Sequence, residues 1–147
     1  MQEAEESWVP HLLGFILPII TIAGIYQGGY WTFSGFVYAL GICPFIDYFA
    51  PERAPVRKEV STRAWNGLLY SHALFFYACI AVLLWRANLD GFTLPVILGG
   101  LSVGIVGGIS GIINAHESGH RKKGSLIWRV ARINMFMVLY SHFTTEH

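Results

Sequence analysis

Two histidines four positions apart are the residues of this chain best suited to chemistry. His116 and His120 flank Glu117 and follow a long apolar stretch. Side chains with this spacing project from one face of an α-helix, one turn apart, so their ring nitrogens can converge on a single metal ion. Ionisable or polar groups at membrane depth are costly enough that a functional role is the first interpretation. The alternative is that the pair only marks the polar end of a helix, beside Arg121.

The spacing alone leaves the kind of metal centre open. In the pattern H-E-x-x-H, two histidines bind zinc and the glutamate, here Glu117, is the general base for peptide hydrolysis. Intramembrane site-2 proteases carry the pattern as H-E-x-G-H, which resembles the segment from His116 to His120. Such a protease also takes an aspartate from an L-D-G motif on a later helix. Leu89-Asp90-Gly91 spells this motif, but it precedes the histidine pair and is expected on the opposite side of the membrane.

A second motif, at the end of the chain, resembles the membrane histidine-box family of alkane hydroxylases, xylene monooxygenases and fatty acid desaturases. The segment from Asn114 to Lys122 resembles the first box of alkane 1-monooxygenases, H-E-L-G-H-K, with Ser118 and Arg121 as departures. The segment from Tyr140 to His147 resembles Y-G-H-F-x-x-E-H, which opens the second box. The two boxes occur in the family's order and at about its separation, which favours iron over zinc.

The resemblance implies two non-haem iron ions that use O2 to hydroxylate the terminal methyl group of an alkane to a primary alcohol. It implies three histidine ligands in this chain, His116, His120 and His147, and imidazole suits iron as well as zinc. Glu117 and Glu146 adjoin ligands and are candidates for orienting them through hydrogen bonds, with surface solvation as the alternative. His142 precedes the second box and lies off the helical face of His147, so we interpret it as a supporting or structural residue.

The resemblance also implies partners. Electrons would pass from NAD(P)H through rubredoxin reductase and rubredoxin, and an apolar hydrocarbon would enter from the lipid. A fatty acyl desaturase or xylene monooxygenase of the same superfamily, a site-2 zinc protease and a membrane protein without metal remain as alternatives. By the family pattern, further histidines and helices follow His147. Residues 1–147 are therefore expected to be the amino-terminal part of one membrane hydroxylase domain, inactive alone.

The composition indicates a membrane protein. Of 147 residues, 54% are hydrophobic and 13% charged, and the mean hydropathy is +0.48, which is too apolar for an ordinary soluble domain. A net charge of +1 with short basic clusters argues against nucleic acid binding. The acidic start from Met1 to Glu6 lacks the basic region of a signal peptide. Cys43 and Cys79 lie in apolar runs without metal or disulfide spacing, so they are predicted to be buried thiols.

The elements that must position the histidines are all expected to be helices, because about 20 apolar residues in a helix cross about 30 Å of hydrocarbon. Stretches of this kind predict an all-α, polytopic membrane bundle of about four transmembrane helices: 9–26, 30–48, 64–85 and 92–116. The segment 125–145 has too short an uncharged stretch to cross and is predicted to be an interfacial or partly buried helix. Small residues in the fourth span are predicted to pack against other helices: Gly100, Gly104, Gly107, Gly108 and Gly111.

The basic residues predict the orientation. Two clusters, 53–63 and 121–123, hold most of them, whereas the other two loops contain only Arg86. The positive-inside rule places both clusters in the cytoplasm, so the metal site is expected to face the cytoplasm, most simply from a bacterial inner membrane. His72 lies in the middle of the third span, where it can face a substrate cavity. A hydrogen bond to a neighbouring helix is the alternative.

Overall fold

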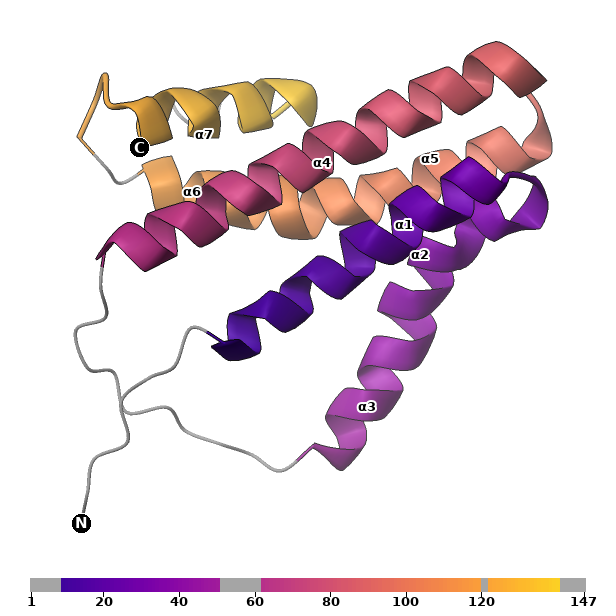
Figure 1. The fold of residues 1–147 in the computed structure, drawn as a ribbon, viewed down its shortest axis with the longest axis horizontal. Helices are drawn as coiled ribbons and strands as arrows, with labels where there is room; N and C mark the ends of the chain where they lie inside the picture. The colour runs from indigo at the N-terminus through magenta and orange to yellow at the C-terminus, as the bar shows by residue number, and fades with distance from the viewer. Residues whose placement is uncertain (1–8, 51–61, 120–121, 141–147) are drawn as a thin grey trace.

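The computed structural model describes residues 9–50, 62–119 and 122–140, and the regular structure within these ranges is entirely helical. Figure 1 shows the helices, in chain order, as an elongated bundle. They are η1 (Val9–Phe15, 3-10), α1 (Ile16–Gln27), η2 (Gly29–Phe33, 3-10), α2 (Ser34–Val37), η3 (Tyr38–Ile42, π), α3 (Cys43–Phe49), α4 (Thr62–Asp90), α5 (Leu94–Val106), η4 (Gly107–Ile113, π), α6 (Asn114–Gly119) and α7 (Leu126–Met137). The predicted all-α class is confirmed.

Three helical stretches are long and apolar enough to cross a membrane. They are Gly29–Phe49, Ala64–Asp90 and Leu94–His116. They coincide with the second, third and fourth predicted spans, except that the third helix continues past its charge-free run, through Arg86 to Asp90. The expected first span corresponds to η1 and α1, where the apolar helix His11–Gln27 is shorter than the other three.

Glycines shape the hairpin between α1 and η2. Gly28 and Gly29 have φ angles of 81° and 56°, a region that other residues rarely adopt, so the chain reverses where the sequence predicted a break. Two more glycines allow the helices to cross closely. A methyl group on Gly24 would collide with Ser34, and one on Gly35 would collide with Thr21. The first two helical stretches therefore form a tight pair at this end.

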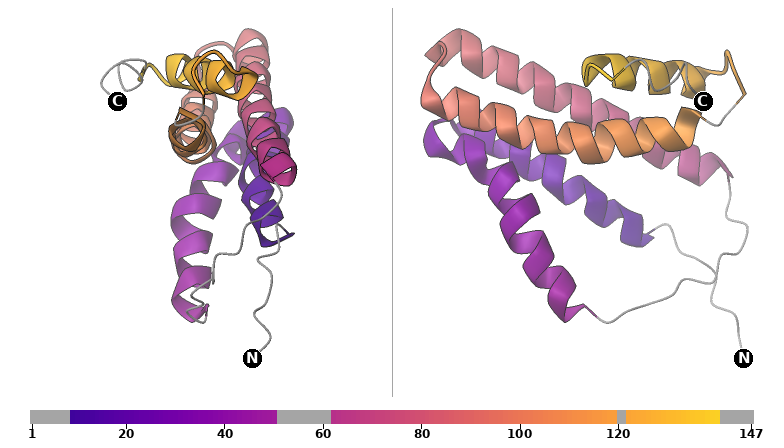
Figure 2. Two further views of the ribbon diagram at one scale, coloured as in Figure 1. Left: turned by 90° about the vertical axis from the view of Figure 1, so that its left-hand side faces the viewer. Right: turned by 180° about the vertical axis from the view of Figure 1, so that it is seen from behind.

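The core lies where α1, α4 and α5 meet, and its buried side chains are Leu17, Ile25, Phe76, Cys79, Val103 and Val106. Cys79 is buried as predicted, whereas Cys43 is only half-buried. The α3 helix diverges from this core, as the two views of Figure 2 show, and none of its residues is buried. The arm from η3 to α3 thus leaves the bundle on one side.

The five glycines of the fourth span that were predicted to pack divide into two groups. Gly107 and Gly111 pack against Phe76 and Val138, as predicted for small residues between helices. A methyl group on Gly100, Gly104 or Gly108 would meet nothing within 4 Å, so within the described residues the packing prediction is wrong for these three. The reason is rotational: these three glycines follow another face of the helix, turned away from α4 and α7.

The α7 helix runs back along α6 and η4. Ala131 packs with Ala115, and Val138 lies against Gly107 and Gly111, so the two helical segments are antiparallel (Figures 1 and 2). The start agrees with the predicted 125–145 helix, since Ser125 caps it by accepting a hydrogen bond from the Trp128 N–H at 3.4 Å.

The end of α7 does not agree with the prediction, because the helix stops at Met137. Leu139 has a φ of 58°, and the N–H groups of Leu139 and Tyr140 donate to the carbonyls of Phe136 and Met135 at 3.0 and 2.8 Å. This pair of bonds satisfies the last carbonyls and closes the helix. A pattern of apolar residues does not reveal such a closure when the left-handed position holds leucine rather than glycine. Residues 141–147 lie outside the described ranges.

Candidate metal centre

His116 stands near the end of a continuous helical path made of α5, η4 and α6. This path contains a π-helical segment, Gly107–Ile113, immediately before the helix that carries the histidine. Wide π turns of this kind occur often at functional sites, because they re-aim the side chains that follow. The rotation of α6 relative to the rest of the bundle therefore decides in which direction His116 points.

Polar contacts on the inner face fix that rotation. Ser110, Asn114 and Ser118 follow one another at four-residue spacing, and all three are buried. The Asn114 side-chain amide donates to the Leu69 carbonyl of α4 at 2.6 Å, and its oxygen accepts from the Ser118 hydroxyl at 3.2 Å. An amide bonded across helices at this depth holds one helix face against its neighbour. The inner face of α6 is thus locked onto α4.

His116 occupies the opposite face. It lies two positions from both Asn114 and Ser118, which at 100° per residue turns it by about 200° away from the anchored side. Its side chain is exposed, and so are Ile109 and Ile113, which precede it on the outer face. The histidine therefore projects outward from the described bundle, beyond an apolar strip. Helical spacing predicts His120 on the same face.

The other proposed ligands fall outside the described residues. His120, His142, Glu146 and His147 lie there, and the side chain of Glu117 does as well. Within the residues that the structure describes, no three His, Cys, Asp or Glu side chains come together as a metal site. Of the proposed ligands, the described part thus supplies the outward imidazole of His116, which suits iron or zinc, on a helix that is anchored to α4.

The α7 helix covers the side of α6 next to the anchored face. Ala115, Ala131 and Met135 form a small buried cluster between them. Asn134 lies in the same helix and is 0% exposed, yet neither side-chain amide atom has a hydrogen-bond partner among the described residues. A buried amide without a partner costs about 1–3 kcal/mol, so this position is a weak point of the α6–α7 packing.

His72 lies on the anchored side of the bundle. Its Nδ1 is 3.3 Å from the Ser110 hydroxyl of η4, and its ring stacks on Phe15 with centroids 4.2 Å apart. These contacts give it partners on two other helices. They match the simpler of its two interpretations, a bond to a neighbouring helix, and its role at a substrate cavity stays a prediction.

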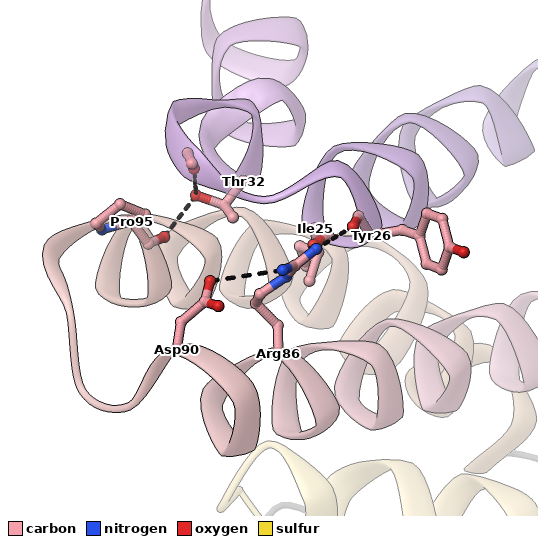
Figure 3. Close-up of polar contacts among 7 residues, drawn as sticks. Ile25, Tyr26, Thr32, Arg86, Asp90 and Pro95 are labelled. Atoms are coloured by element: carbon pink, nitrogen blue, oxygen red, sulfur yellow. Dashed lines mark hydrogen bonds and ion pairs between the residues drawn. The ribbon is translucent and has the colours of Figure 1, made fainter.

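A polar junction at the other end of the bundle was not anticipated from the sequence. Figure 3 shows Arg86 of α4 reaching the end of α1, where its Nε donates to the Ile25 carbonyl at 2.9 Å and its guanidinium also reaches the Tyr26 carbonyl. Asp90 lies 3.6 Å from the same guanidinium. A cation on the last carbonyls stabilises a helix end. The signal available in the sequence was that Arg86 is the single basic residue between the third and fourth spans.

The same junction joins η2 to α5. The Thr32 hydroxyl contacts the Pro95 carbonyl (Figure 3), and the Ser102 hydroxyl donates to the Thr32 carbonyl at 2.8 Å. These contacts fasten the ends of helices far from His116. We assign them to the stability of the bundle.

Comparisons of the chain with family models, with curated proteins and with solved structures gave no match.

Proposed function

We propose that this chain forms part of a membrane-embedded, non-haem diiron oxygenase that hydroxylates the terminal methyl group of an apolar hydrocarbon. The observation that carries the proposal is the outward placement of His116 on a helix whose opposite face is anchored by Asn114. A metal ligand needs an exposed side chain on a helix that does not rotate; His116 is exposed, and the bonds of Asn114 hold its helix. The resemblance of residues 140–147 to the opening of a second histidine box also supports the proposal.

In this proposal His116, His120 and His147 hold iron, and the two irons supply the activation of O2. The chain's own residues act around them. The bonds of Asn114 to Leu69 and Ser118 keep α6 from turning, so the imidazole of His116 keeps its direction. Glu117 and Glu146 are proposed to accept hydrogen bonds from ligand histidines and so fix the orientation of their rings.

The length of chain after α7 permits His147 to join this group. Val138 lies at the level of Gly107 and Gly111, which are five to nine residues before His116, or about 8–14 Å along the helix axis. The seven residues that follow Tyr140, up to His147, reach at most about 25 Å when extended. His147 is therefore within reach of His116 without any change in the α6–α7 packing.

The surface next to His116 suits an apolar substrate. Ile109 and Ile113 lie exposed on the outer face of the same helix, and Ile113 is 64% exposed. An alkyl chain lying along this strip would bring its end to His116 from the hydrocarbon region. We propose four crossings with the amino terminus inside, which places His116 on the cytoplasmic side, where rubredoxin reduced through rubredoxin reductase by NAD(P)H can deliver electrons. A fatty acyl desaturase or a xylene monooxygenase would use the same surface.

A site-2 zinc protease is the second candidate, and one observation weighs against it. The L-D-G aspartate, Asp90, pairs with Arg86 at 3.6 Å, at the far end of the bundle. The helix path from Leu94 to His116 separates it from the histidine by about 30 Å. A shared zinc ion needs ligands within about 2 Å of the metal, so Asp90 cannot complete such a site.

Metal content and product analysis test the proposal. The full-length protein, purified in mild detergent, is expected to hold about two irons per chain, as a two-metal site requires. Supplied with reduced rubredoxin, a linear alkane and ¹⁸O2, it is expected to give a primary alcohol that carries the label. One zinc per chain would favour the protease, and a protein without metal would refute both metal proposals.

A further inference from the structure

The α7 helix presents one buried face and one exposed face. The first is buried against the bundle and consists of Ile127, Ala131, Asn134 and Met135. The second includes the apolar residues Leu126, Ile133 and Phe136, at 66%, 50% and 66% exposure. Between the exposed apolar positions stand Arg129 and Arg132, both exposed. A helix with one face on the protein and an exposed face that combines apolar and basic residues has the composition of an element at a membrane surface.

Positive charge is concentrated around this helix. Five of the chain's ten Lys and Arg residues stand between positions 121 and 132, and no acidic residue occurs between Glu117 and Glu146. Lys122 and Lys123, just before α7, are exposed. The guanidinium of Arg132 lies over the ring of Trp128 at 5.0 Å, which braces its stem without neutralising its charge. The surface therefore carries positive charges that an anion would stabilise.

The packing of α7 sets the depth of these charges. Ala131 lies against Ala115, next to the end of the apolar stretch Leu94–His116. The helix then continues beside that stretch, and Val138 is about 10 Å further along it. The basic residues are thus level with the end of a membrane span, whereas Phe136 and Met137 are level with its interior. Long basic side chains at this level extend toward headgroups.

We propose that Lys122, Lys123, Arg129 and Arg132 bind the headgroups of anionic phospholipids, while Ile133 and Phe136 contact their acyl chains. The apolar residues decide between a lipid and a soluble acidic partner. A soluble anion or an acidic protein would neutralise the charges but leave Ile133 and Phe136 exposed, whereas a phospholipid satisfies both groups at once. The cytoplasmic leaflet, which we propose faces this end, is the anionic one.

Lipid binding at the outer face of α7 also affects α6, because the buried face of α7 packs against it. Ala131 and Met135 pack on Ala115, the neighbour of His116. A lipid that holds the outer face of α7 thereby holds the helix against which α6 rests. The inference does not depend on the metal or on the reaction, because it uses the charge, exposure and depth of α7; it shares with the proposed function only the orientation in the membrane.

Native mass spectrometry of the full-length protein tests the proposal. Detergent-solubilised protein is titrated with dioleoylphosphatidylglycerol or dioleoylphosphatidylcholine, and the bound lipid is counted. We expect the anionic lipid to bind more tightly, and the Arg129→Gln/Arg132→Gln variant to bind it about 25-fold more weakly, because each basic residue at an anionic surface contributes about fivefold. The variant is expected to bind phosphatidylcholine as the wild type does.

Two controls keep the result decisive. The Arg129→Lys/Arg132→Lys variant keeps the charges and is expected to retain most of the affinity. If the glutamine variant loses its helical circular dichroism, Lys122→Gln/Lys123→Gln, which lies before the helix, replaces it with the same expected loss. Equal binding of the two lipids, no loss in the glutamine variants, or complete displacement of the lipid by millimolar inorganic phosphate would overturn the proposal.

Discussion

Replacement of Asn114 by alanine is expected to destabilise the fold by about 1–2 kcal/mol. The change removes the 2.6 Å hydrogen bond to the Leu69 carbonyl, and bonds between helices in a membrane contribute about 0.6 kcal/mol on average and up to about 1.7. It also removes the acceptor of the Ser118 hydroxyl, which is 2% exposed. That hydroxyl can turn to a carbonyl of its own helix, so the second loss is smaller than the first.

Reversible unfolding in mixed micelles, followed by far-ultraviolet circular dichroism as the fraction of denaturing detergent rises, measures this loss. Asn88→Ala is the matched control, because Asn88 is an exposed asparagine of α4. Ser118→Ala is expected to cost less than Asn114→Ala, since the bond to Leu69 survives. If Asn114→Ala unfolds at the same point as Asn88→Ala, the anchoring of α6 by this amide is refuted.

Three further changes test the packing by the same unfolding assay. Arg86→Ala is expected to destabilise the fold by about 2 kcal/mol, because it leaves the carbonyls of Ile25 and Tyr26 without their donor. Asp90→Asn removes only a 3.6 Å ion pair and should cost less than about 1 kcal/mol. Equal costs of the two changes would contradict this ranking. The new methyl group of Gly35→Ala must displace Thr21, so this change is expected to cost about 1–3 kcal/mol. The methyl group of Gly104→Ala meets nothing within 4 Å, so this change should be neutral or stabilising by up to about 1 kcal/mol. A destabilising Gly104→Ala would show that this face of the helix is packed. Asn134→Leu is expected to stabilise the protein, because it removes a buried amide that has no partner among the described residues; a loss of stability would show that the amide has one.

The helices could be predicted from the sequence because hydrocarbon thickness is a strong constraint. The charge-free runs predict the bounds of Gly29–Phe49 and Leu94–His116 to within a few residues, whereas Ala64–Asp90 continues past its run through the charged residues Arg86 and Asp90. The break at Gly28 was also visible, since two adjacent glycines interrupt an apolar run. The spacing of His116 and His120 predicts one helix face for both; the structure describes His116, which is exposed, whereas His120 lies outside the described residues.

The relative rotation of the helices could not be predicted in this way. Of the five glycines in the fourth span that were predicted to pack, only Gly107 and Gly111, which face α4 and α7, are packed among the described residues. The end of α7 at Met137 depends on a left-handed leucine, which no sequence pattern signals. The outward direction of His116 follows from the hydrogen bonds of Asn114, and a single sequence does not show which partner a buried amide chooses.

The iron content of the full-length protein with His116 replaced by alanine tests the central claim most directly. His72→Gln is the matched control, because His72 also lies in a helix that is long and apolar enough to cross a membrane, but its ring is 3.3 Å from the Ser110 hydroxyl on the inner face. We predict that His116→Ala loses at least one of the two irons while its helical circular dichroism is unchanged, and that His72→Gln keeps both. Full iron content in His116→Ala, or equal loss in the two variants, would contradict the assignment of His116 as a ligand.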